Sequence, residues 1–467
     1  MRVTLYYISL VSTGHKLMKI SKLLSVVTLL AGVADAAGYR AGVARRIITP
    51  DKPIYLSGYG NRNRPSEGKA SDLWAKALAL DDGRGNRLVI VAVEVVGLPR
   101  SITEVIAARA AKDYRLQRSQ LLLNFSHTHT GPLIRGNLEM MFELTPEESA
   151  VVGEYSRKLA DDLVELIGLA LKDLAPAQLS FGNGTGAIAI NRREHTPKGV
   201  RLGLNPKGPS DHDVPVLKVT APDGTLRAVV FGYACHNTTL GGDFYKISGD
   251  YSGYAQEGVE NANPGSTAMF LQLCGGDQNP NPRLTLDIAA RHGASLAAEV
   301  NRVLIRPLQP VNGRIRSVFQ VVDLEFAFHT REKFEELLKT GNKFQQRNAR
   351  LQLKAYDDGR PVRRYPYPVQ GVAFGQDLVL VALGGEVVVD YALRIKKEYG
   401  DRGIIVAGYS NDVMSYIPSL RVLKEGGYEP VDSMTYYGQP GPYNEEVEDR
   451  VMGAVHNVMK RLKRKKL

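Results

Sequence analysis

Two histidines stand two positions apart directly after an apolar run, and their spacing is suited to a metal site. His127 and His129 follow Leu121–Phe125, a run that predicts a buried strand. Residues two apart at the end of a strand point to the same side, so both imidazoles can face one cavity. A buried histidine that serves only as a hydrogen-bonding group is the ordinary alternative for each. The pair therefore indicates a metal site without establishing it.

Two further residues of ligand type follow apolar runs in the same way. His236 comes after the run 229–234, and Glu386 comes after a Leu-Gly-Gly turn at the start of a predicted helix. Zinc in hydrolases takes imidazole and carboxylate ligands and keeps one position for water, which two histidines and one glutamate would satisfy. A structural histidine and a carboxylate that favours the helix dipole are the alternatives. Asp250 and Asp277 are predicted to orient the histidines, with turn formation as their alternative role.

These residues need a scaffold that brings the ends of distant strands together. Strand–helix–strand order in 88–125 predicts a right-handed parallel unit, with function at the carboxyl ends of its strands. We expect an α/β fold with a mixed, largely parallel sheet, flanking helices and the site at the strand carboxyl ends. The predicted strands are 88–96, 121–125, 217–219, 227–234, 268–273, 378–383 and 403–408. The predicted helices are 101–114 with Ser101 as N-cap, 145–171, 252–260, 286–304 and 389–399.

The two ends of the chain differ in composition from the rest. Lysines precede an apolar run at 23–33 and Ala34-Asp35-Ala36 follows it, which predicts a signal peptide over 18–37 and export to the periplasm or the medium. Residues 1–17 before Met18 are interpreted as an overcalled start, and an uncleaved membrane anchor is the alternative. Residues 460–467 hold six basic side chains, a tail predicted to be solvated or, alternatively, to contact an anionic membrane surface.

The residues between these ends, 38–459, have the composition of one large folded domain. Of the 467 residues, 43% are hydrophobic and 23% are charged, and the formal net charge is +11. Apart from the tail, no basic cluster or motif indicates a nucleic-acid partner. Cys235 and Cys274 fit either one disulfide or two buried apolar side chains. The basic stretch 339–364 predicts a surface insertion or a lid.

Several short motifs together resemble one family. Segments 126–132 (SHTHTGP), 248–255 (SGDYSGYA), 276–281 (GDQNPN), 385–386 (GE) and 410–416 (SNDVMSY) are similar, in this order, to motifs of the neutral/alkaline non-lysosomal ceramidases. The resemblance covers about residues 40–450. It implies zinc bound by His127, His236, Glu386 and Tyr416. It also implies that His129 acts as an acid/base or oxyanion-stabilising group near the metal. Arg192 matches a position that holds the polar head of the substrate, with a surface salt bridge as its alternative role.

One position departs from the family pattern in a way that bears on mechanism. The family has Gly-Asp-Val-Ser-Pro-Asn, with the serine proposed as nucleophile, where this chain has Asn279. We therefore expect a zinc-bound water to attack the carbonyl, His129 to protonate the leaving group or stabilise the oxyanion, and Asn279 to donate a hydrogen bond to substrate. The family's C-terminal immunoglobulin-like domain is not expected in this chain.

The predicted function is an exported zinc-dependent hydrolase of amide or ester bonds, similar to ceramidases. Its partner would be a lipid or other small molecule. The alternatives are a zinc hydrolase of a non-lipid substrate, such as a carbohydrate-linked amide, and a catalytically inactive exported binding protein on the same fold. The sequence leaves the natural substrate and the oligomeric state open.

Overall fold

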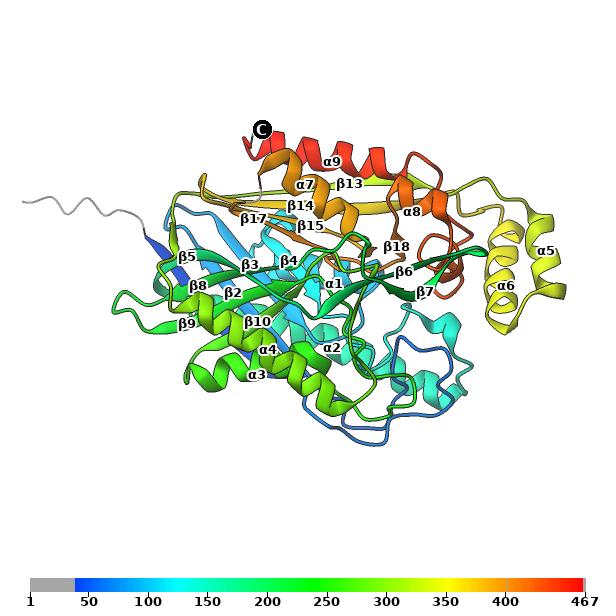
Figure 1. Cartoon of the computed structure of the whole chain (residues 1–467), viewed down its shortest axis with the longest axis horizontal. Coiled ribbons are helices and arrows are strands. Elements are labelled where there is room, and N and C mark those ends of the chain that lie inside the picture. Colours follow the sequence, from blue (N-terminus) through cyan, green and yellow to red (C-terminus); the bar gives the residue numbers. More distant parts are fainter. Residues whose placement is uncertain (1–37, 401, 465–467) are drawn as a thin grey trace, which may run out of the picture. The chain divides into compact units, whose positions relative to one another are not determined.

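The fold is built from two packed sheets with helices on their outer faces. The computed structural model describes residues 38–400 and 402–464, so the predicted signal peptide, the region before it and residues 465–467 lie outside the described part. One core cluster joins apolar side chains of both sheets, and three others lie between a sheet and its helices. The layers are therefore helix, sheet, sheet, helix (Figure 1).

The larger sheet has nine strands within the described residues. Its order is β10 (Thr267–Gln272), β9 (Leu226–Tyr233), β8 (Asp213–Thr220), β5 (Ala175–Thr185), β1 (Tyr39–Ile47), β2 (Trp74–Asp81), β3 (Arg87–Val93), β4 (Leu121–Phe125), with β12 (Gln309–Val311) beside β5. In β3, alternate residues face opposite layers. Val89 and Val91 pack toward helices, whereas Leu88 and Ile90 pack toward the second sheet. Burial on both faces explains the continuous apolar run in this strand.

The second sheet closes the other side of the shared core. Its order is β13 (Ile315–Glu325), β14 (Arg364–Phe374), β15 (Leu378–Leu383), β17 (Ile404–Ala407). Two smaller sheets lie near the strand ends: β11 (Gln278–Pro280), β6 (Ala189–Thr196) and β7 (Gly199–Asn205), and the pair β16 (Glu386–Val387) and β18 (Tyr416–Ile417). Asn124 links the two large sheets, because its amide donates to the carbonyl oxygens of Gln272 and Gly408.

The helices divide between the outer faces. On one part of the larger sheet lie α1 (Arg100–Tyr114) and α2 (Pro146–Lys172), and on the other α3 (Asp250–Ala262) and α4 (Leu286–Leu304). The second sheet carries α7 (Val389–Tyr399) and α9 (Val447–Arg461). A pair of helices, α5 (Arg331–Thr340) and α6 (Lys343–Asp357), forms the basic insertion, and α8 (Leu420–Glu425) follows β18. In Figure 1 the α5–α6 pair projects beyond the end of the second sheet.

The predicted α/β class with a mixed sheet and flanking helices is confirmed, but the predicted largely parallel pairing is wrong. Among the described strands only four pairings are parallel, β3–β4, β9–β10, β15–β17 and β16–β18, and the rest are antiparallel. The parallel prediction came from the strand–helix–strand unit at 88–125, which the structure contains as β3, α1 and β4. Most neighbouring strands of the larger sheet pair in antiparallel fashion instead.

The helix cap predicted at Ser101 is also wrong. Helix α1 starts one residue earlier, at Arg100, with Pro99 as N-cap and no side-chain cap. The carbonyl oxygen of Pro99 accepts the amide hydrogen bonds of Ile102 and Thr103, so the Ser101 hydroxyl is not needed there. By contrast, Thr145 caps α2 in a capping box with Glu148, at the start of the helix predicted over 145–171.

The described part of the basic tail continues from α9. This helix runs through Lys460 and Arg461, Leu462 is buried, and Arg464 donates to the carbonyl oxygen of Gln376. Among the residues that the structure describes, no helix is both long and apolar enough to cross a bilayer. Cys235 and Cys274 are both buried and unpaired.

Candidate metal centre

The four predicted ligands and His129, the predicted acid/base group, lie beyond the ends of four different strands. His127 and His129 follow β4, His236 follows β9, Glu386 follows β15, and Tyr416 comes in the segment after β17. All five side chains are buried. The structure thus brings together residues up to 289 positions apart at the carboxyl ends of these strands, where the sequence analysis expected the site.

The backbone fixes which nitrogen His127 and His236 present to the centre. Nδ1 of His127 lies 2.6 Å from the carbonyl oxygen of Val96, and Nδ1 of His236 lies 2.8 Å from that of Gly275. A carbonyl oxygen only accepts, so each Nδ1 carries a hydrogen, and in the neutral ring Nε2 is the nitrogen with the free lone pair. This is the arrangement found in metal-binding histidines, where a partner on one nitrogen sets the tautomer and the other binds the ion.

Glu386 lies opposite both of these lone pairs. Its Oε2 is 3.0 Å from Nε2 of His127 and 3.0 Å from Nε2 of His236. Its Oε1 accepts a short hydrogen bond from the Tyr437 hydroxyl. Pairing of β16 with β18 places Glu386 directly beside Tyr416 in register. The Tyr416 hydroxyl is 3.1 Å from Nε2 of His236.

These donors fit a bound cation. In the neutral ring with its hydrogen on Nδ1, each Nε2 is an acceptor, and the carboxylate of Glu386 is an acceptor as well, so one cation between the three atoms would satisfy all of them. Burial, then the charge of Arg192, lowers the pKa of His236 to about 4, so its imidazole is neutral near pH 7. Burial raises the pKa of Glu386, but His127 and His236 hold it well below its usual range. Two imidazoles and one carboxylate are a zinc donor set.

His129 completes a group of three histidines. Ligand nitrogens of His127, His129 and His236 all lie within 4.8 Å of one another. Nε2 of His129 is 3.1 Å from Nε2 of His127, while its Nδ1 is buried without a hydrogen-bond partner among the described residues and lies against Gly58. Burial keeps the pKa of His129 well below its usual value, so this ring is neutral. The same geometry allows His129 to bind the metal or to exchange a proton beside it.

Arg192 is buried rather than part of a surface salt bridge. It donates from Nη2 to the Tyr416 hydroxyl at 2.9 Å and from Nη1 to Oδ1 of Asn279 at 3.2 Å. Its Nε donates to the carboxylate of Glu429 at 2.9 Å. Glu429, which the sequence analysis did not identify, also binds the buried guanidinium of Arg193. Arg192 therefore connects the predicted ligand Tyr416 with the position where the family has serine.

The predicted roles of Asp250 and Asp277 as partners of the histidines are wrong. Asp277 accepts from the backbone amide of Val389 at 2.8 Å and from Asn191 at 3.0 Å, and so caps α7. Asp250 accepts from the backbone amide of Leu240 at 2.9 Å at the start of α3. Backbone carbonyl groups orient the histidines instead, because the turns after β3 and β10 bring them within reach. Tyr437, which contacts the ligand Glu386, lies in no motif that could have identified it.

The fold and the site thus define a mixed α/β protein with a buried centre of histidine, glutamate and tyrosine that is suited to a metal ion. Residues 39–287, more than half of the chain, match the model of the neutral/alkaline non-lysosomal ceramidase N-terminal domain. The chain belongs to the neutral/alkaline non-lysosomal ceramidase family.

Individual relatives are distant. The neutral ceramidase of Pseudomonas aeruginosa is 25% identical over 332 residues, which cover 64% of this chain and 48% of that protein. The neutral ceramidase of Drosophila melanogaster is 24% identical over 272 residues, 55% of this chain and 38% of that protein. The chain therefore matches about half or less of the length of these curated relatives.

A solved structure shares the fold. The crystal structure of neutral ceramidase from Pseudomonas aeruginosa superposes with a TM-score of 0.70 at 19% identity, over 92% of this chain and 76% of that chain. A ceramidase complexed with C2 gives a TM-score of 0.71 at 18% identity with the same coverage. At this identity the likeness concerns the fold.

Proposed function

We propose that this protein is an exported, zinc-dependent amide hydrolase of ceramidase type. The observation that carries the proposal is the 3.0 Å contact of Glu386 Oε2 with the Nε2 atoms of both His127 and His236, three buried atoms of the types that bind zinc. Tyr416 would be the fourth ligand. Family membership supports hydrolysis of an amide as the reaction.

A zinc ion held by these side chains would polarise a carbonyl oxygen and lower the pKa of water at the centre. The chain's own residues would do the remaining work. His129 is neutral, so its Nε2 accepts a proton from the attacking water and then delivers it to the leaving nitrogen. Arg192 holds the Tyr416 hydroxyl in place through its own hydrogen bond. Asn279 keeps its Oδ1 on Arg192 and has an amide N–H₂ group to donate to substrate.

A second candidate substrate class is a hydroxyl-rich amide, such as one linked to a carbohydrate. A cavity of about 390 Å³ lies beside the centre, between the α5–α6 pair and the 428–442 segment. Tyr428 lines this cavity, and its ring centroid is 5.6 Å from that of Tyr416. Lys333, Asp432 and several amide side chains share the lining with Phe344 and other apolar residues. Such a mixed lining suits a polar group as well as an alkyl chain.

The metal assignment is tested by measuring zinc in purified protein. We expect about one zinc per chain in the wild type and a loss of most of it in a variant that combines His127→Ala with His236→Ala. His292→Ala is the matched control, because this half-buried histidine lies outside the centre and forms a hydrogen bond with the carbonyl oxygen of Pro282. Equal zinc content in the wild type and in the double variant would refute the assignment.

The reaction is tested with a panel of N-acyl amides that carry either a long-chain amino alcohol or a sugar as the amine. Chelator-sensitive hydrolysis of the first group supports a ceramidase, and hydrolysis confined to the second supports the hydroxyl-rich alternative. In Asn279→Ser the family's residue is restored. If ceramide hydrolysis appears only in this variant, the natural substrate is a different amide. Absence of any hydrolysis by zinc-loaded protein would favour the alternative that the chain is a catalytically inactive binding protein.

Export is proposed from the lysine-flanked apolar run at 23–33 and the Ala-Asp-Ala that follows it. The N-terminal sequence of the mature protein, determined after expression of the full chain, tests this step. A start close to residue 38 supports cleavage. A retained N-terminus in the membrane fraction supports the uncleaved anchor instead.

A further inference from the structure

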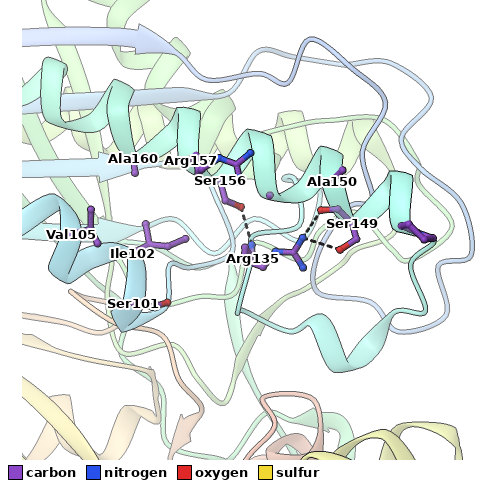
Figure 2. A pocket seen from close by; sticks show the side chains of 11 residues that line it. Ser101, Ile102, Val105, Arg135, Ser149, Ala150, Ser156, Arg157 and Ala160 are labelled. Atoms are coloured by element: carbon purple, nitrogen blue, oxygen red, sulfur yellow. Dashed lines mark hydrogen bonds between the residues drawn. The ribbon is translucent and has the colours of Figure 1, made fainter.

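A groove with a volume of about 540 Å³ lies on the outer face of the larger sheet, between α1 and α2. Figure 2 shows Ile102 and Val105 on α1, Ser149 and Arg157 on α2, and Arg135 in contact with Ser149. None of the lining residues belongs to the metal centre, and neither the motifs nor the proposed reaction gives this groove a role. We define the α1–α2 groove by its lining: Ser101, Ile102, Val105, Arg135, Pro146, Ser149, Ala150, Gly153, Ser156, Arg157 and Ala160.

Two guanidinium groups converge above a glycine in this groove. A Cβ atom placed on Gly153 would lie 3.3 Å from Nη2 of Arg135 and 3.5 Å from Nη1 of Arg157. The absence of a side chain at Gly153 therefore leaves room where both arginines reach the same point. Like charges so close together repel, and an anion at this point would be attracted by both.

The charges around this point sum to one positive charge. Arg135 donates from Nη1 to the carboxylate of Glu139 at 2.6 Å, and this pair is neutral overall. Arg157 makes no hydrogen bond or ion pair with another residue of the described chain. Glu154, the nearest acid in the sequence, is bound to Lys52, and the charges of both Lys52 and Arg157 act on its carboxylate. The Lys52–Glu154 and Arg135–Glu139 pairs are each neutral overall, so the remaining guanidinium matches a ligand that carries a single negative charge.

The walls of the groove are apolar next to this charged point. Ile102, Val105, Ala150 and Ala160 line it, and Val105 is 50% exposed. The hydroxyl of Ser101 is the polar group on the α1 side. A ligand with one anionic end and a short apolar chain would therefore match both parts of the groove.

We propose that the α1–α2 groove binds a monoanionic amphiphile, an alkyl carboxylate, with its carboxylate between Arg135 and Arg157 and its chain against Ile102 and Val105. Arg157 can hold a carboxylate through bidentate hydrogen bonds, the way that guanidinium groups prefer, whereas Arg135, whose Nη2 already donates to Ser149, adds positive charge. A carboxylic acid is also what hydrolysis of an N-acyl amide releases. The proposal does not depend on that reaction, because no residue of the metal centre takes part.

Titration calorimetry of the full-length protein with decanoate tests the proposal. We expect saturable binding, with an affinity about tenfold lower in Arg157→Ala because one charge-assisted contact is lost. Lys158→Ala is the matched control: it removes the same charge from the next position of α2, where the lysine binds Asp162 outside the groove. This control should bind decanoate like the wild type.

Further arms separate the groove from the metal centre and from a membrane surface. In His236→Ala, binding that depends on Arg157 should persist, whereas decanoate bound only at the metal centre would be lost, which would overturn the proposal. Inorganic phosphate and decylamine should bind at least tenfold more weakly than decanoate. Equal affinity for phosphate and decanoate would overturn the proposal that the groove binds an amphiphile. Binding to anionic phospholipid vesicles that requires Arg157, without binding of monomeric decanoate, would assign the groove to a lipid surface instead.

Discussion

Replacing Glu429 by glutamine should destabilise the fold strongly, because it removes a buried charge that two arginines share. Glu429 is 1% exposed, and its two oxygens accept from Arg192 Nε at 2.9 Å and from Arg193 Nη1. Removal of one partner from a buried ion pair costs about 3–5 kcal/mol. Arg193 keeps a second carboxylate, that of Glu425 at 3.1 Å, so we expect a value near the lower end, about 3 kcal/mol.

The assay is urea unfolding of zinc-loaded protein at pH 7, with Glu445→Gln as control. Glu445 has an exposed side chain 3.8 Å from Lys424, and its replacement should leave the free energy of unfolding unchanged within error. A decrease of less than about 1 kcal/mol in the free energy of unfolding of Glu429→Gln would refute the reasoning.

The effect of Glu429 should also depend on pH. Burial raises the pKa of Glu429, but Arg192 and Arg193 outweigh it and hold the pKa below its usual value. A carboxyl group whose pKa is depressed by folding stabilises the protein above its unfolded pKa of about 4.3, and this contribution is lost as the pH falls. The difference in free energy of unfolding between the wild type and Glu429→Gln should therefore become smaller below about pH 4.

Three further changes give separate tests. Burial raises the pKa of Glu94 to about 7. A raised carboxyl pKa stabilises the fold only at low pH, so in urea unfolding the wild type should lose on the order of 3 kcal/mol relative to Glu94→Gln between about pH 4 and pH 7. Gly58→Ala and Gly68→Ala both place alanine at a φ near +90°, costing about 1 kcal/mol or more, but only at Gly58 would the new Cβ lie 2.3 Å from a histidine of the centre. Hydrolysis should fall more than tenfold in the first variant alone; equal activities would contradict this. Tyr437→Phe removes a hydrogen bond to the glutamate ligand and should weaken zinc binding 10- to 100-fold in chelator competition. Tyr436→Phe should leave zinc affinity unchanged, and a similar loss in both would point to packing.

Much of the candidate site could be predicted because three of the predicted ligands follow strongly apolar strands. The runs before His127, His236 and Glu386 are buried strands in the structure, and the turns after them converge on one point. Tyr416 came from the family resemblance alone. Tyr437 and Glu429 were missed because they contact partners 51 and 237 positions away, from a segment with no periodic pattern.

The fold was predicted less completely, for a physical reason. Continuous apolar runs such as β3 show that a strand is buried on both faces, but not whether its neighbours are parallel. The face of β3 opposite α1 and α2 packs on a second sheet rather than on helices. Strands β5, β6 and β7 contain many polar residues and glycines, so their apolar pattern is weak and they were not predicted.

The pairing of β16 with β18 has a consequence for how the protein folds. The Glu386 side chain contacts the His236 ring at a sequence separation of 150 positions, and the same ring contacts the Tyr416 hydroxyl at a separation of 180. Contacts so distant in sequence form late, because the entropic cost of closing the intervening loops precedes the favourable free energy of the contact. A ribosome-bound chain that ends before residue 386 lacks half of these donors. Zinc uptake would therefore report completion of the fold, and the ion would lock in the native state instead of nucleating it.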